Sequence, residues 1–392
     1  MSSPAPTPPG RRRLDIDALR IGACLTQFVY HTGKVFDTDP IYHVKNDVLS
    51  STVTAVTTFT HLWRMPLFFV LAGWAAATVL RHRDAATFRR GRARRLAPPL
   101  LFGIVVLCPP IKYVERLGGI DNRPSGHYPG EPFALGFLEF LPRFFFNIRD
   151  FSWSHMWFLA YLLMFSLLLA PLLRRIVTGR DRLDSGRWLA YAPLLPLVLL
   201  ETTLRPAWGS FPNLYADWAS LAVYLTYFLA GALLAREARA DTLASECRGL
   251  GLLGLAALGG LAAVDSPVLR HAATAVAGWG SVGFLVGASR RWWHYDGPSI
   301  RYLSEATLPL YVLHHTPSVL LAFVIVGLPL ALPGKLALLL LSSVLATFGL
   351  YHACVRPWAA MRFWLGMRPP LRPLPTASGP APLARERSPL KT

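Results

Sequence analysis

The chain has 392 residues, of which 53% are hydrophobic and only 16% are charged. Soluble domains carry about 25% charged residues, so this composition excludes an ordinary soluble protein and predicts a fold with much of its surface in lipid. The net charge of +18 lies in short basic blocks between apolar runs, a pattern typical of cytoplasmic membrane loops, and we expect no nucleic-acid partner.

The first residues, 1–13, are rich in proline, serine and arginine, and we expect them to form a disordered basic tail. No apolar segment with a small-residue cleavage site follows them, so we expect no cleavable signal peptide. The first hydrophobic stretch is therefore predicted to be a retained helix that also directs membrane insertion.

Apolar runs follow one another along most of the chain. A membrane-spanning helix needs about 20 mostly apolar residues, and we find about ten such runs. Lysine and arginine concentrate in alternate connecting segments, which predicts an even number of spans with both termini in the cytoplasm. The runs lie at 16–36, 53–80, 97–114, 156–173, 188–204, 216–235, 249–265, 271–289, 300–326 and 335–355.

The predicted fold class is therefore all-α: a polytopic integral membrane helical bundle in the cell membrane, formed by residues 14–366. A Pro-rich, basic segment at 367–392 is predicted to be a disordered C-terminal tail. The longest predicted outer loop, about 115–155, ends in an aromatic stretch. That stretch is either an aromatic belt at the membrane interface or an amphipathic cap over a substrate cavity.

Titratable side chains inside predicted spans are candidates for a functional site, because placing them in lipid is costly. The first span carries Arg20 and His31, whose spacing of eleven residues puts both side chains on one helix face. The alternative for each residue is a hydrogen-bonded group that only packs the bundle. The same reasoning selects five further residues that lie in or at the outer ends of other spans: His61, Arg64, His155, Tyr311 and His314.

Imidazoles at similar depths on separate helices suit acid–base chemistry. A neutral imidazole near pH 7 takes a proton from an alcohol and returns one to a leaving group. We expect no metal site, because no HExxH or His/Cys ligand spacing is present and the four cysteines are not paired at CxxC spacing. Four further histidines fall in predicted loops or at interfaces and are not selected: His43, His82, His127 and His294.

An arginine-rich run between the second and third spans has two interpretations. It is typical of simple cytoplasmic anchoring, and it is also what phosphate recognition needs, since a guanidinium matches the geometry of phosphate oxygens. Arg92 and Arg95 share one face if this run is helical.

These segments together resemble the acyltransferase-3 family, membrane O-acyltransferases that modify carbohydrates, peptidoglycan and natural products. The first-helix signature is Leu-Asp-Ile-Asp-Ala-Leu-Arg at 14–20 followed by His31, and Arg92 and Arg95 match the family's Arg-x-x-Arg pair. Ala72 stands where the family has a small hydroxyl residue. The other similar segments are 61–73, 155–159 and 308–316, the last two being similar to the subgroup that adds succinyl groups to periplasmic glucans.

The resemblance implies an acyl-CoA-dependent O-acyltransferase acting on a hydroxyl of a carbohydrate or related acceptor. Arg92 and Arg95 would hold the phosphates of acyl-CoA, and Arg20 and His31 would be essential. His31 would be the general base or a transient acyl carrier, and the sequence leaves both open. The alternative function is a proton-coupled transporter or flippase of an anionic or acylated solute, which intramembrane histidine and arginine also suit.

Overall fold

The computed structural model describes residues 13–120, 133–179 and 186–367, apart from residues 209, 211, 215, 236 and 294. The predicted tails, except for Arg13 and Met367, lie outside these ranges, as do His127 and His294. Every regular element within the described ranges is a helix, which agrees with the predicted all-α class.

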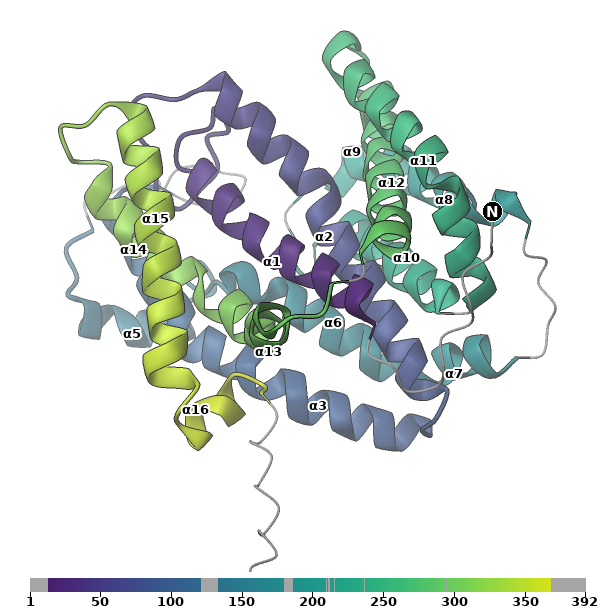
Figure 1. The fold of residues 1–392 in the computed structure, drawn as a ribbon. Coiled ribbons are helices and arrows are strands. Elements are labelled where there is room, and N and C mark those ends of the chain that lie inside the picture. Colours follow the sequence, from purple (N-terminus) through teal and green to yellow (C-terminus); the bar gives the residue numbers. More distant parts are fainter. Residues whose placement is uncertain are drawn as a thin grey trace, which may run out of the picture.

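The α-helices are numbered in chain order, as in Figure 1. They are α1 (Leu14–Gly33), α2 (Ser51–Leu80), α3 (Ala85–Phe102), α4 (Cys108–Leu117), α5 (Phe137–Phe146), α6 (Trp157–Leu168), α7 (Ala170–Thr178), α8 (Leu194–Thr203), α9 (Arg205–Trp208), α10 (Trp218–Leu234), α11 (Glu237–Ala263), α12 (Pro267–Trp292), α13 (Pro298–Leu313), α14 (His315–Ile325), α15 (Leu332–Leu350) and α16 (Ala359–Trp364). Shorter helical turns are η1 (Gly103–Leu107), η2 (Ser154–Met156), η3 (Arg187–Ala190) and η4 (Tyr351–Val355).

Side chains at the first residues explain where several helices begin. The Asp84 carboxylate accepts the backbone N–H of Thr87 at 2.9 Å, and the Asp217 carboxylate accepts that of Ser220 at 2.8 Å. Each bond satisfies one of the N–H groups that a helix leaves unpaired in its first turn. The two aspartates therefore define the starts of α3 and α10.

Each of the ten predicted apolar runs overlaps one helix or a pair of consecutive helices. By length and composition, four described segments can cross a membrane, namely α2, Ala85–Leu117, α12 and Leu332–Val355. The number rises to six if each of two bent helix pairs is one span. The described part of the chain is thus an all-helical bundle with several membrane-capable segments, and the total of ten spans stays a prediction.

The bend between α13 and α14 measures 54° and falls at His314 and His315. Pro317 lies two residues after His315, and it has no N–H to donate to the carbonyl of Leu313, four residues earlier. Its ring also clashes with that carbonyl in a straight helix, which explains the bend. The bend directs two consecutive imidazoles into the bundle.

Small residues allow a close helix crossing between α2 and α10. A Cβ atom at Gly73 would lie 1.8 Å from the carbonyl oxygen of Phe228, and one at Gly231 would lie 1.9 Å from that of Val70. Backbone contact of this kind is typical of helices that associate in lipid. α11 and α12 also pack closely, and they form the long hairpin at the upper right of Figure 1.

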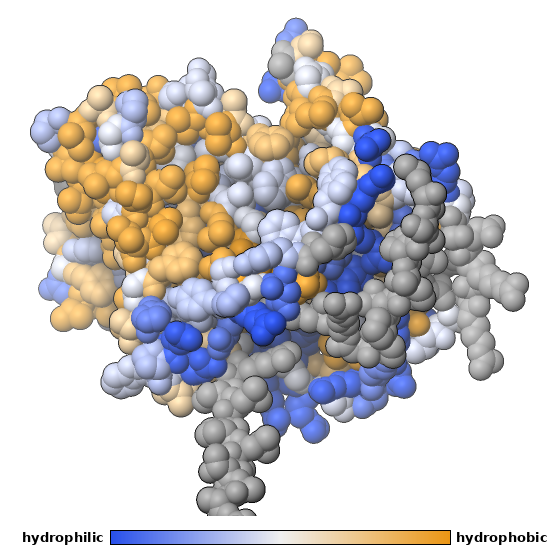
Figure 2. Space-filling model, viewed as in Figure 1, coloured by the Kyte–Doolittle hydropathy of each residue, from blue (hydrophilic) through white to orange (hydrophobic). Residues whose placement is uncertain are grey.

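The molecular surface separates into apolar and polar regions. Figure 2 shows a broad hydrophobic area over the side of the bundle that carries α14 and α15, and hydrophilic residues gathered toward the lower edge near α3 and α16. Exposed apolar side chains on α15 include Leu338, Leu341 and Leu345. A broad apolar surface is what a lipid-facing helix needs.

The amphipathic helix considered for the long aromatic loop is present as α5. It buries Phe140 and Phe144 in the hydrophobic core, with the Phe140 ring 5.7 Å from the ring of Tyr113 on α4. Its other face exposes Leu138 and Phe146. The segment after this helix, not the helix itself, lines the cavity described next.

Candidate functional site

A cavity of about 870 Å³ lies between the C-terminal ends of α1, α8 and α13 and the N-terminal parts of α2, α6, α10 and α12. In the predicted topology these helix ends share the outer half of the membrane. Exposed Asp39 and Arg270 lie at its edge, whereas Tyr224 and Tyr227 form part of its deeper wall. The cavity thus combines polar groups with an aromatic lining, as is usual for ligand sites.

Imidazole rings from distant parts of the chain meet at one end of this cavity. The ring of His31 lies 4.3 Å from the ring of His315 and 4.9 Å from that of His314. The ring of His155 lies 4.8 Å from that of His315. These residues come from α1, from η2 and from the α13–α14 bend, so the fold brings together His31, His155 and His314 as predicted.

Hydrogen bonds to backbone carbonyls define the protonated nitrogens of two of these rings. His314 Nδ1 donates to the carbonyl of Tyr311 at 2.7 Å, and His155 Nε2 donates to the carbonyl of Val312 at 2.9 Å. A carbonyl oxygen only accepts, so each contacting nitrogen carries a proton. The second nitrogen of each ring is buried and has no hydrogen-bond partner among the described residues.

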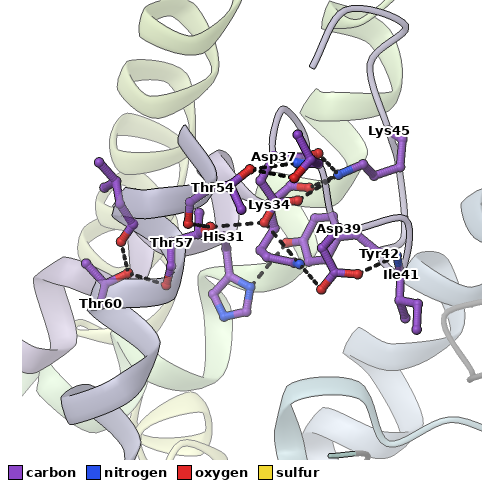
Figure 3. Close-up of polar contacts among 12 residues, drawn as sticks. His31, Lys34, Asp37, Asp39, Ile41, Tyr42, Lys45, Thr54, Thr57 and Thr60 are labelled. Carbon is purple, nitrogen blue, oxygen red and sulfur yellow. Dashed lines mark hydrogen bonds and ion pairs between the residues drawn. The ribbon is translucent and has the colours of Figure 1, made fainter. Parts of the chain in front are cut away.

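His31 lies in the last turn of α1 and is only partly buried, because it lines the cavity. Its Nδ1 is 3.1 Å from the hydroxyl oxygen of Tyr42. When Nδ1 donates to this hydroxyl, Nε2 keeps a lone pair and is able to accept a proton. Figure 3 shows the ring attached to α1 and directed toward Tyr42.

The loop that carries Tyr42 is held by an ion-pair network, shown in Figure 3. Lys34 Nζ lies 2.7 Å from an Asp39 oxygen and 3.1 Å from an Asp37 oxygen, and Lys45 Nζ contacts Asp37 at 2.8 Å. Burial alone would raise the pKa of the Asp39 carboxyl, but hydrogen bonds from Lys34 and the Ile41 amide bring that pKa below its ordinary value. The network holds the loop against the cavity.

His43 lies in the same loop, and sequence reasoning did not select it. Its ring is buried and lies 5.0 Å from the ring of His315. His43 Nδ1 lies 2.7 Å from a carboxylate oxygen of Glu115, and the Lys112 ammonium donates to the same carboxylate. No local sequence pattern marks His43 as a site residue, because its place depends on how the loop folds back over α4.

Arg64 is an almost fully buried cation in the cavity wall, with 3% of its surface exposed. Its guanidinium carbon lies 4.0 Å from the centre of the Tyr30 ring, and the ring of His61 stacks on Tyr30 at 5.4 Å. Nη1 of Arg64 has no hydrogen-bond partner in the part of the chain that the structure describes. His61 and Tyr311 also line the cavity, so the structure groups these three predicted residues with His31.

The remaining predicted residues lie elsewhere. Arg20 forms a 2.8 Å ion pair with Asp17 and donates to Ser304, which joins α1 to α13. The guanidinium of Arg92 stands over the Phe88 ring at 5.2 Å, on α3 together with Arg95. None of Arg20, Arg92 and Arg95 is among the described residues that line the cavity.

The chain is similar to one protein family along most of its length. The family model described as an acyltransferase domain matches residues 13–352. The chain is 22% identical over 184 residues to glucans biosynthesis protein C of Escherichia coli, and the alignment covers 45% of this chain. It covers only 43% of that relative, less than half of its length. No solved structure matches the chain.

Proposed function

The chain belongs to the acyltransferase-3 family, and from this membership we propose that it is a membrane O-acyltransferase. The donor in this proposal is acyl-CoA, and the acceptor is a hydroxyl of a carbohydrate or related metabolite. The observation that carries the proposal is the position of His31, in the wall of a large cavity with one ring nitrogen at the Tyr42 hydroxyl. Its other nitrogen is then available to the acceptor.

His31 acts as the general base in this proposal. Its Nε2 takes the proton of the acceptor hydroxyl while the hydroxyl oxygen attacks the thioester carbonyl. The tetrahedral intermediate collapses, the C–S bond breaks, and the His31 imidazolium returns the proton to the departing thiolate. The products are an ester and free CoA, and the imidazole ends in its starting state.

Arg64 supplies the positive charge that the reaction needs. Negative charge develops on the former carbonyl oxygen in the transition state, and a positioned cation in a water-poor site stabilises it strongly. The Arg64 guanidinium is already desolvated and is held against Tyr30, which supports this role. His61, His155, Tyr311 and His314 would shape the acceptor side of the cavity.

The donor would enter from the opposite side. With ten spans and both termini in the cytoplasm, α3 begins at the inner surface, and the cavity opens toward the outer one. Arg92 and Arg95 would hold the phosphates of acyl-CoA, whose pantetheine arm would reach toward His31. Arg20 would fix α1 to α13 so that His31 keeps its position, which the Arg20–Ser304 contact supports.

A transfer assay tests this proposal. Purified protein in lipid nanodiscs would receive a panel of radiolabelled acyl-CoA thioesters together with sugars and extracted metabolites, and mass spectrometry would identify the ester. Acyl carrier thioesters, offered in parallel, test whether CoA is the donor. Label in an acceptor supports the enzyme, whereas uptake of a solute into liposomes without any acyl transfer supports a transporter instead.

A further inference from the structure

We infer that His31, His314 and His315 form a binding site for a divalent transition-metal ion of the zinc class, and that the occupied site cannot transfer acyl groups. One ring nitrogen of each residue lies within 4.8 Å of those of the other two. Imidazole is a common ligand of zinc, copper and nickel. The three ligands come from α1 and from the α13–α14 bend, so no local spacing in the sequence reveals them.

Hydrogen bonding prepares His314 for a metal. Metal-bound histidines usually donate their second ring N–H to a carbonyl or carboxylate, which sets the tautomer and the ring orientation. His314 Nδ1 makes this contact with the Tyr311 carbonyl, which leaves a lone pair on Nε2. That Nε2 is fully buried and has no hydrogen-bond partner among the described side chains and backbone groups.

His315 presents a second buried nitrogen of the same kind. Its Nδ1 also lacks a hydrogen-bond partner within the described ranges, and only 1% of the residue is exposed. Leaving a buried polar atom without a hydrogen-bond partner destabilises the fold. These two nitrogens without partners are explained if a metal ion among the three rings accepts their lone pairs.

The geometry requires only a small adjustment. With metal–nitrogen distances of 2.0–2.1 Å, nitrogens around a tetrahedral ion lie about 3.4 Å apart, so the present 4.8 Å limit calls for closure of at most about 1.4 Å. Three imidazoles leave a fourth position, which faces the cavity because His31 and His315 line it. The three histidines include no carboxylate, so we expect them to bind hard cations such as Mg²⁺ and Ca²⁺ weakly.

Metal binding would prevent the step that His31 performs. Nε2 of His31 has one lone pair, and a metal ion on this nitrogen removes the base that the acceptor hydroxyl needs. This inhibitory consequence rests on the proposed function, whereas the binding site does not. Zinc would therefore compete with catalysis at the same imidazole.

A metal titration tests the site directly. The purified full chain, stripped with a chelator, would be titrated with Zn²⁺ alone and analysed for bound metal, and Co²⁺ would report a tetrahedral site by its visible absorption. We expect one ion per chain and no binding of Mg²⁺ or Ca²⁺. His314→Gln and His315→Gln should each weaken zinc by more than the roughly 10–100-fold that loss of an outer-shell partner costs.

The exposed His82 provides the matched control, because it lies outside the cavity lining and His82→Gln should leave zinc affinity unchanged. Gel-filtration profiles and metal-free unfolding temperatures would show that the variants fold. Absence of stoichiometric zinc, or wild-type zinc affinity in both cluster variants, would overturn the site. Zinc-loaded protein with full transfer activity would overturn the inhibition alone. Stoichiometric zinc binding, together with no acyl transfer by the metal-free protein, would overturn the proposed function alone.

Discussion

Nδ1 of His31 lies 3.1 Å from the hydroxyl oxygen of Tyr42, eleven residues further along the chain. The Tyr42 side chain is buried, and the Lys34, Asp37 and Lys45 network holds its loop in place. A fixed hydrogen bond at one ring nitrogen orients the other. The relationship between these two residues therefore makes His31 a positioned base rather than a mobile side chain.

Replacement of this base is the first test. His31→Gln should lower kcat by about 10²–10⁴-fold, the usual contribution of general-base catalysis, with little change in unfolding temperature. Tyr42→Phe should lower kcat much less, because it removes one hydrogen bond worth about 0.5–1.5 kcal/mol and keeps the base. Steady-state kinetics of both variants, with His82→Gln as control, check this. Near-normal kcat in His31→Gln would exclude the base role.

Arg64 should act on the transition state rather than on ground-state binding. Arg64→Met removes the charge but keeps much of the side-chain volume, and kcat should fall by about 10²–10³-fold, as when an oxyanion donor is lost. Arg64→Lys keeps a cation and should recover part of the rate. Measured kcat and KM separate the alternatives, since a raised KM with unchanged kcat would assign Arg64 to substrate binding instead.

Arg92 and Arg95 on α3 should affect the binding of the acyl-CoA donor and not that of the acceptor. Hydrogen bonds between charged groups contribute about 1.5–3 kcal/mol, so Arg92→Ala or Arg95→Ala should weaken acyl-CoA binding by about 10–150-fold. Arg90 is exposed on the same helix, and Arg90→Ala is the matched control. Equilibrium binding of labelled acyl-CoA measures the change in affinity. Added salt should also weaken acyl-CoA binding to the wild-type protein, because it screens the attraction between arginine and phosphate. Equal affinity in all four proteins would remove the proposed donor site.

The helices of this fold are predictable from the sequence because lipid leaves few alternatives. An apolar run of about 20 residues has to satisfy its backbone within itself, so each predicted run overlaps a helix. The interruptions are harder to predict. Pro66 lies inside the uninterrupted helix α2, whereas the chain bends by 54° just before Pro317. Both prolines lack the N–H that a helix uses, so the presence of proline alone does not predict a break.

The site is predictable only where residues lie in spans. Intramembrane position selected His31, His61, Arg64, Tyr311 and His314, because titratable groups in lipid are rare without a function. The sequence does not predict His43 as a site residue, because a titratable side chain in a loop does not bear the cost of burial in lipid. Its membership in the cluster follows from long-range pairing with Glu115, which no single-sequence pattern contains.

The α2–α10 crossing should tolerate no side chain at Gly73. A Cβ atom there would lie 1.8 Å from the Phe228 carbonyl oxygen, and both partners are backbone, so the helices have to separate. Gly73→Ala should therefore lower the unfolding temperature despite the better helix propensity of alanine. At Gly22 a Cβ meets nothing within 4 Å, so Gly22→Ala should be neutral or stabilising. Equal thermal shifts for the two variants would contradict this crossing.

Replacement of the buried Glu115 alone should destabilise the fold more than replacement of Glu115 together with Lys112. Glu115→Gln leaves the Lys112 ammonium buried beside a neutral amide, and loss of one partner of a buried ion pair typically costs about 3–5 kcal/mol. The double variant Lys112→Met and Glu115→Met removes both charges and should be more stable than Glu115→Gln, because it removes the buried ammonium together with the carboxylate. Thermal unfolding in nanodiscs measures both. A double variant less stable than the single one would show that the carboxylate contributes mainly through His43, at 2.7 Å, and not through the lysine.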